Sequence, residues 1–117
     1  MLGNVLYRQA QLLQILAEPV GGNGLVALAH QEIATKLNLA LGGPECIQPV
    51  IDQVDAIIGN LVVPPIGAGS LLPCNTSGYV DVLAKYNEGR LNGCSMNHCD
   101  EQEPRFLREF NGCIRRR

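Results

Sequence analysis

The sequence predicts an all-α fold, a bundle of four or five helices with one long Pro/Gly-rich crossover loop and disulfide cross-links. Apolar residues recur at helical spacing over several stretches, and glycine and proline separate these stretches. The length of 117 residues suits one domain. Five cysteines and no tryptophan indicate an aliphatic core held in part by disulfides.

The first two helices are expected over residues 6–17 and 25–41. The first should end before Pro19, because proline disfavours helix in the residue that precedes it, and its expected apolar face is Leu6, Ala10, Leu13 and Leu16 or Ala17. The second should end at the Gly-Gly-Pro of residues 42–44, a helix stop signal. Its expected face is Val26, Ala29, Ile33, Leu37 and Ala40.

The third helix is expected over residues 46–61, with Pro49 in its first turn, where proline is tolerated. It has the cleanest amphipathic pattern of the chain, made by Ile47, Val50, Ile51, Val54, Ile57, Ile58 and Leu61. Residues 62–73 contain three prolines and no helical period. They predict an ordered, mostly extended loop that crosses the bundle, because their apolar content is high for a flexible linker.

The fourth helix is expected over residues 78–91, with Thr76 or Ser77 as its N-cap. Its expected apolar face is Val80, Leu83, Ala84, Asn87 and Leu91. Residues 95–117 begin as a Cys-rich acidic turn. After Pro104 they continue as a short amphipathic helix that carries Phe106, Leu107, Phe110 and Ile114.

Charge divides the chain unevenly. Residues 1–103 hold four Lys/Arg and ten Asp/Glu, whereas residues 104–117 hold five Arg and one Glu. We expect residues 1–94 to form the helical module, with 95–117 packed on it or appended to it. The tail ends in an interaction candidate, Arg115, Arg116 and Arg117. Without stacking aromatics these arginines make nucleic acid an unfavoured partner, and no apolar run is long enough for membrane insertion.

One cluster has metal-ligand chemistry. A tetrahedral Cys₃His zinc set could come from Cys94, His98, Cys99 and Cys113. Adjacent His98 and Cys99 are poorly spaced for this, so we favour disulfides over a metal or free thiols. The disulfide candidates are Cys46, Cys74, Cys99 and Cys113. Five cysteines allow fifteen frameworks with one thiol left over, and spacing alone leaves the pairing open.

The polar residues near the apolar faces favour structural roles. His30 has no nucleophile elbow to serve, so we expect a hydrogen bond at the helix-packing seam. Asn38 and Asn87 should bond loop backbone. Asp52 and Asp55, three residues apart, could form an acid/base pair, but both lie off the apolar face and are expected to be solvated charges. These residues predict no catalysis and no cofactor.

Up to Cys94, about four-fifths of the chain resembles a helical module of secreted bacterial proteins. The resemblance rests on the spacing of seven blocks, residues 2–7, 11–16, 22–25, 28–38, 55–59, 62–67 and 86–89. It implies export and a non-enzymatic role. Family members usually carry a Cys and a Gly-Tyr-Trp-Lys segment ahead of the point where this chain begins, so Leu2, Val5 and Leu6 are expected to lack cover.

With that family cysteine missing, Cys94 is expected to be the unpaired thiol. The expected bridges are then Cys46 with Cys74 and Cys99 with Cys113. The sequence thus predicts a non-catalytic, secreted structural or interaction module that binds itself or another extracellular protein. Contact of the Arg-rich tail with the acidic body would be heterologous and could build a fibre. The alternative is an extracellular binding module that holds a metal ion or an anionic polymer through the Cys-rich turn and the tail.

Overall fold

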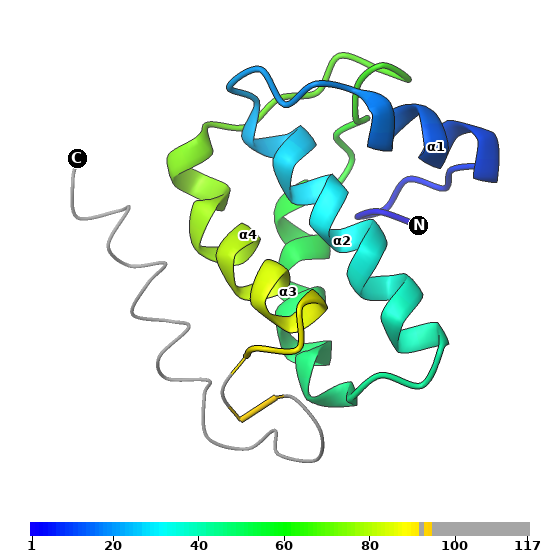
Figure 1. Ribbon diagram of the computed structural model, residues 1–117. Helices are drawn as coiled ribbons and strands as arrows, with labels where there is room; N and C mark the ends of the chain where they lie inside the picture. Colours follow the sequence, from blue (N-terminus) through cyan, green and yellow to red (C-terminus); the bar gives the residue numbers. More distant parts are fainter. Residues whose placement is uncertain (92, 95–117) are drawn as a thin grey trace.

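The computed structural model describes residues 1–91, 93 and 94, and within them the chain is all-α (Figure 1). The elements in order are α1 (Gln9–Ala17), α2 (Gly24–Ala40), the short 3₁₀ helix η1 (Glu45–Ile47), α3 (Gln48–Ile58) and α4 (Pro73–Asn87). Helix α2 packs most extensively on α4 and also contacts α1 and α3. The sequence-based expectation of an all-α bundle is confirmed.

The core is aliphatic, as the composition predicts. Helix α3, together with Ile47 of η1, buries the face expected of it apart from the half-buried Ile57. The helix ends at Ile58 rather than at the expected residue 61, and Leu61 lies half-buried beyond it. Helix α2 buries a broad face from Leu25 to Thr35, with Leu37 exposed. The fully buried large apolar side chains of these two helices and η1 are Leu25, Val26, Leu28, Ile47, Val50, Val54 and Ile58.

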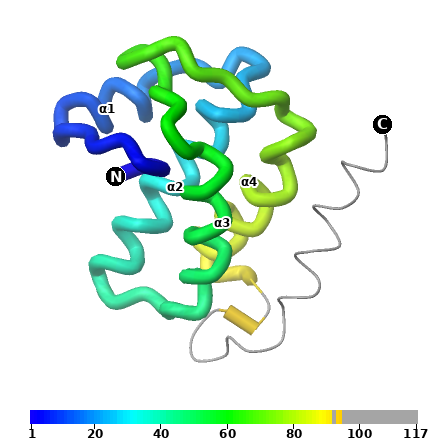
Figure 2. Tube along the Cα trace, turned by 180° about the vertical axis from the view of Figure 1, so that it is seen from behind, coloured from blue at the N-terminus to red at the C-terminus, as the bar shows by residue number. Residues whose placement is uncertain are grey.

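The crossover loop is ordered, as expected, and Figure 2 shows it running from α3 over one end of the bundle to α4. Asn23 fixes it to the start of α2. Its Nδ2 donates to the Gly69 carbonyl at 3.0 Å, and its Oδ1 accepts from the amides of Leu25 and Leu71 at 2.9 and 3.2 Å. The buried Tyr7 hydroxyl accepts from the Val63 amide at 3.0 Å.

Helix α4 begins at Pro73, earlier than the expected residue 78. Proline fits the first turn because the amide it lacks would have no partner there, and Leu72 rather than Thr76 or Ser77 is the N-cap. Thr76 instead lies inside the helix, 1% exposed. The fully buried positions of α4 become Thr76, Val82, Leu83 and Tyr86.

The expected apolar face of α1 is wrong. Helix α1 contacts α2 through Ile15, which is fully buried, while Leu13 is 59% exposed. Apolar residues at 12, 13, 15 and 16 form one continuous arc of about 160° at 3.6 residues per turn, so periodicity alone did not choose which edge of that arc is buried. A hydrogen bond between His30 Nε2 and the Ile15 carbonyl, at 2.7 Å, joins the two helices.

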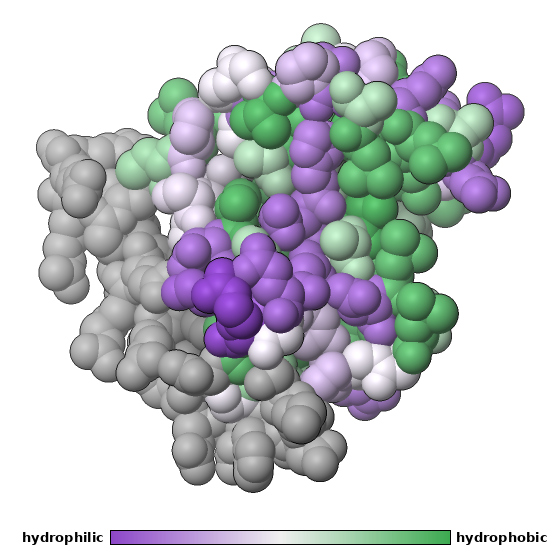
Figure 3. All heavy atoms as spheres, viewed as in Figure 1, coloured by the Kyte–Doolittle hydropathy of each residue, from purple (hydrophilic) through white to green (hydrophobic). Residues whose placement is uncertain are grey.

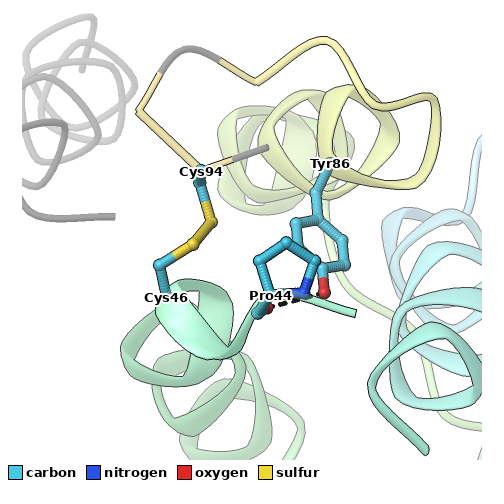
Figure 4. Close-up of a disulfide and its surroundings, with 4 residues drawn as sticks. All are labelled: Pro44, Cys46, Tyr86 and Cys94. Carbon is cyan, nitrogen blue, oxygen red and sulfur yellow. Dashed lines mark hydrogen bonds between the residues drawn. A yellow bond between two sulfur atoms is a disulfide. The ribbon is translucent and has the colours of Figure 1, made fainter. Parts of the chain in front are cut away.

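The expected disulfide pairing is also wrong, because Cys46 pairs with Cys94 (Figure 4). Cys46 lies in η1, which the chain reaches directly after the turn that ends α2. This places it near the C-terminal end of α4, where the Tyr86 hydroxyl donates to the Pro44 carbonyl at 2.7 Å. Cys74 is in the first turn of the same helix, about 20 Å away at 1.5 Å per residue. Cys74 is itself disulfide-bonded.

The N-terminal segment covers itself in part, contrary to expectation. Leu2 is 2% exposed and pairs with Val5 in an isolated antiparallel bridge. Gly3 has φ +62°, and a Cβ there would lie 2.6 Å from the Gly59 carbonyl oxygen, so only glycine fits. Leu6 is 77% exposed.

Candidate interaction surface

A buried polar cluster joins α2 to α3. Glu32 of α2 is fully buried, and neither of its carboxyl oxygens has a hydrogen-bond partner among the described residues. Lys36 Nζ lies 3.6 Å from Glu32 and 3.2 Å from Asp55 of α3. Burial, followed by interaction with Asp55, raises the pKa of Glu32 to about 9, so this side chain is neutral at pH 7.

Asp55 is the charged carboxylate of the cluster. Partial burial acts to raise its pKa, but interactions with Glu32, the Gly3 amide and Lys36 outweigh burial and lower the pKa of Asp55. Asp55 therefore neutralises Lys36, while Glu32 adds no charge near neutral pH. The expectation that Asp55 is a solvated charge is wrong. Asp52 is exposed as expected and accepts a hydrogen bond from Gln48 at 2.9 Å.

The cluster holds the N-terminal segment against α2 and α3. Lys36 Nζ donates to the Met1 carbonyl at 2.6 Å, and the Gly3 amide donates to Asp55 Oδ1 at 2.9 Å. The Asn4 amide adds a bond to the Gly59 carbonyl at 2.8 Å. These bonds position Met1 as one wall of an apolar groove.

That groove lies between α1, the N-terminal segment and α2, and has a volume of about 280 Å³. Four of its lining residues are exposed apolar side chains, and we call them the leucine surface: Met1, Leu13, Leu16 and Leu37. In Figure 3 hydrophobic side chains gather on this side of the molecule, over α1 and the adjoining part of α2. A contiguous apolar surface of this kind is typical of a contact site.

Helix α1 carries no charged residue along its nine positions, in contrast to the other three α-helices. Its ends are charged instead, with Arg8 before the first turn and Glu18 after the last. Neither forms an ion pair within the part of the chain that the structure describes. The exposed residues of α1 are thus all uncharged: they are Gln9, Ala10, Leu13, Gln14, Leu16 and Ala17.

The remaining polar predictions concern His30, Asn38 and Asn87. His30 lies between α2 and α1, where it is bonded as expected. Asn38 and Asn87 bond mainly to one another's helices rather than to loop backbone: Asn38 Nδ2 donates to Asn87 Oδ1 at 2.8 Å. Asn87 Oδ1 also accepts from the Thr35 hydroxyl at 3.1 Å, and its Nδ2 donates to the Gln31 side chain at 3.0 Å. This network fixes α4 to α2.

The other site predictions lie outside the described residues, namely His98, Cys99, Cys113, Arg115, Arg116 and Arg117. The disulfide occupies the sulfur of Cys94, which removes one thiolate from the zinc set. Within residues 1–91, 93 and 94, no three His, Cys, Asp or Glu side chains are grouped as metal ligands. None of the helices in this part of the chain is long and apolar enough to cross a membrane.

Comparisons of the chain with protein-family models, curated proteins and solved structures found no match. The function is therefore argued from this chain alone. Sequence reasoning missed the leucine surface because the buried side of α1 was chosen wrongly. Sequence reasoning also missed the buried polar cluster around Glu32. A signal was available, because Glu32 stands at helical spacing from Leu28 and Thr35 on the buried face of α2.

Proposed function

We propose that the chain is a non-catalytic extracellular interaction module that contacts its partner through the leucine surface. The observation that carries the proposal is the exposure of the surface: Leu13 and Leu37 are 59% and 58% exposed beside a groove. Removing such side chains from water on binding is favourable by about 25 cal/mol per Å² of apolar area.

The segments that form and surround the leucine surface are held in place by hydrogen bonds and an ion pair. Asn23 fixes the crossover loop, the Lys36–Asp55 pair fixes the N-terminal segment, and His30 fixes α1 to α2. A contact surface that is already ordered loses less conformational entropy on binding. This supports a role in recognition.

Lys36, which lines the groove, and the nearby titratable groups Asp55 and His30 all make bonds that hold the fold together. Lys36 and Asp55 are paired with each other and with the backbone of Met1 and Gly3, and His30 is bonded to a backbone carbonyl. These groups serve to hold segments of this chain together, which is why we propose binding rather than catalysis. Cys46 and Cys94 form a disulfide. Because disulfides persist in oxidising compartments, this bridge supports export.

Hydroxyl-radical footprinting tests the proposal. The chain is labelled in the extracellular fraction of the cells that produce it, and again as dilute purified protein. We expect oxidation of Leu13, Leu16 and Leu37 to be at least about threefold lower in the native fraction, because a partner excludes water from the contact. Leu72, 64% exposed at the start of α4, is the internal control and should label equally in both. Equal labelling of all four leucines contradicts the proposal.

A further inference from the structure

We propose that Cys74 forms a second disulfide with Cys113, which fastens the C-terminal segment along the outer side of α4. Cys74 lies in the first turn of α4 and is disulfide-bonded. Since Cys46 and Cys94 are bonded to each other, the cysteines that remain are Cys99 and Cys113. The partner of Cys74 is one of these two, and both lie outside the described residues.

The first argument is the length of chain needed to reach Cys74. The bridge to η1 holds Cys94 near the C-terminal end of α4, and Cys74 lies at the other end, about 20 Å away at 1.5 Å per residue. Cys99 follows Cys94 by five residues, which span about 17 Å when fully extended. Even with the roughly 6 Å between the Cα atoms of a disulfide, Cys99 would reach Cys74 only along a straight line parallel to α4. Such a line leaves no room for the turn expected after Cys94.

Cys113 reaches Cys74 without this constraint. It follows Cys94 by 19 residues, which is enough for both the expected turn and the expected helix after Pro104. A helix over residues 104–113 rises about 14 Å. The turn before it then has to cover only about 6 Å of the length of α4, which nine residues do easily. The length of the chain therefore favours Cys113.

The second argument is the position of Cys113 on the expected helix. At about 100° per residue, Cys113 lies about 20° from Phe106 and about 60° from Phe110 round the helix. Arg108 and Arg115 lie about 140° and 160° away from it. Cys113 thus shares the apolar face, and an amphipathic helix packs on the rest of the protein through that face. Packing would bring this cysteine toward α4 and leave the two arginines on the far side.

The third argument is the side of α4 on which Cys74 stands. Thr76 marks the side toward α2, because a Cβ on Gly24 would lie 2.5 Å from its hydroxyl oxygen. Cys74 is two residues earlier, about 160° round the helix, and it is exposed. Figures 1 and 2 show α1 and α4 on opposite sides of α2. A segment fastened to Cys74 therefore lies away from the leucine surface, so this inference is independent of the proposed function.

The second bridge changes the roles of the remaining cysteines. Its formation takes two protons and two electrons from the thiols of Cys74 and Cys113, and these pass to a disulfide of the oxidising compartment, which becomes two thiols. Cys99 is then the odd thiol, in place of the Cys99–Cys113 bridge expected from the sequence. With Cys94 and Cys113 both in disulfides, the zinc set keeps only His98 and Cys99, too few ligands for a tetrahedral protein site.

Peptide mapping of the unreduced, purified full chain tests the pairing. Free thiols are first alkylated at acidic pH, which suppresses disulfide exchange. The chain is then digested with trypsin, which cleaves after Lys and Arg. The cysteines fall in three tryptic peptides: Cys46 and Cys74 in 37–85, Cys94 and Cys99 in 91–105, and Cys113 in 109–115.

We expect one disulfide-linked species that contains all three peptides, with a single alkyl group on Cys99. The mass before digestion should be that of one chain. Release of the peptide that holds Cys113, free and alkylated, overturns the proposal in favour of a bridge between Cys74 and Cys99. An alkyl group on Cys74 overturns it as well, because Cys99 would then pair with Cys113. A disulfide-linked dimer of the chain also contradicts it.

Two variants give a matched check. Cys99→Ser should take up no alkyl group, because every remaining cysteine is bridged. The double variant Cys99→Ser with Cys113→Ser should take up one, on Cys74, since its partner is gone. Circular dichroism of both variants confirms that they are folded. Alkylation of Cys74 in the single variant would overturn the proposal.

Discussion

Replacing Glu32 by glutamine should remove a pH dependence from the stability of this chain. Burial raises the pKa of Glu32 from its ordinary value of 4.5 to about 9. Between these values the folded chain keeps a proton that the unfolded chain releases. Stability therefore falls as pH rises, by about 1.4 kcal/mol per pH unit. From pH 5 to pH 8 the loss is about 4 kcal/mol, a large part of the 5–15 kcal/mol typical of a domain.

Glutamine has nearly the shape of the neutral acid and does not ionise. The Glu32→Gln variant should therefore lack this slope, and the difference in unfolding free energy between variant and parent should grow in favour of the variant with rising pH. The assay is urea denaturation at half-unit steps of pH, with Glu45→Gln, at an exposed position in η1, as the control. Asp55 acts in another window: its lowered pKa gives stability above its ordinary value of 3.8 that is lost as pH falls below it. Parallel curves for Glu32→Gln and the parent from pH 5 to pH 8 would refute the account of this cluster.

Two further predictions concern the disulfide and the hydrogen bonds that join α4 to α2. The Cys46–Cys94 bridge, with a sequence separation of 48, should contribute about 4 kcal/mol in the chain-entropy model, so the double Cys→Ser variant should melt at least about 10 °C lower in calorimetry; an unchanged Tm contradicts this. Asn87→Ala leaves the Thr35 hydroxyl and the Asn38 amide short of a partner and should cost about 1–3 kcal/mol in urea denaturation. A loss below about 0.5 kcal/mol would show that the network does not fix α4 to α2.

The parts of the fold that the sequence predicted well are those where one physical signal dominates. The helix over α3 follows from a strong 3.6-residue period, and α2 ends within a residue of its expected position because Gly42 and Gly43 stop it. The start of α4 was misplaced because Thr76 has the chemistry of an N-cap. Pro73 was an equally good start, because proline fits the first turn of a helix, and the structure has α4 begin there.

The site was harder to predict because it depends on contacts between distant segments. The burial of Glu32 depends on how α3 packs on α2, and the pairing of Cys46 depends on where η1 meets α4. The spacing of residues along the chain determines neither the packing of α3 on α2 nor the position of η1 beside α4. The two apolar sides of α1 are similar in sequence, and the hydrogen bond of His30 to the Ile15 carbonyl fixes the side that is buried.

Hydrogen exchange of the α1 amides, measured in the native extracellular fraction and in the dilute purified chain, tests the central claim most directly, namely that the exposed side of α1 is a contact surface. Helix α1 has few contacts with the rest of the bundle, so its amides should exchange through local opening when the chain is purified and dilute. Binding of a partner stabilises the closed state, and we predict that the amides of residues 9–17 exchange at least about tenfold more slowly in the native fraction, while those of α4 stay unchanged. Identical exchange of α1 in both samples would contradict the account.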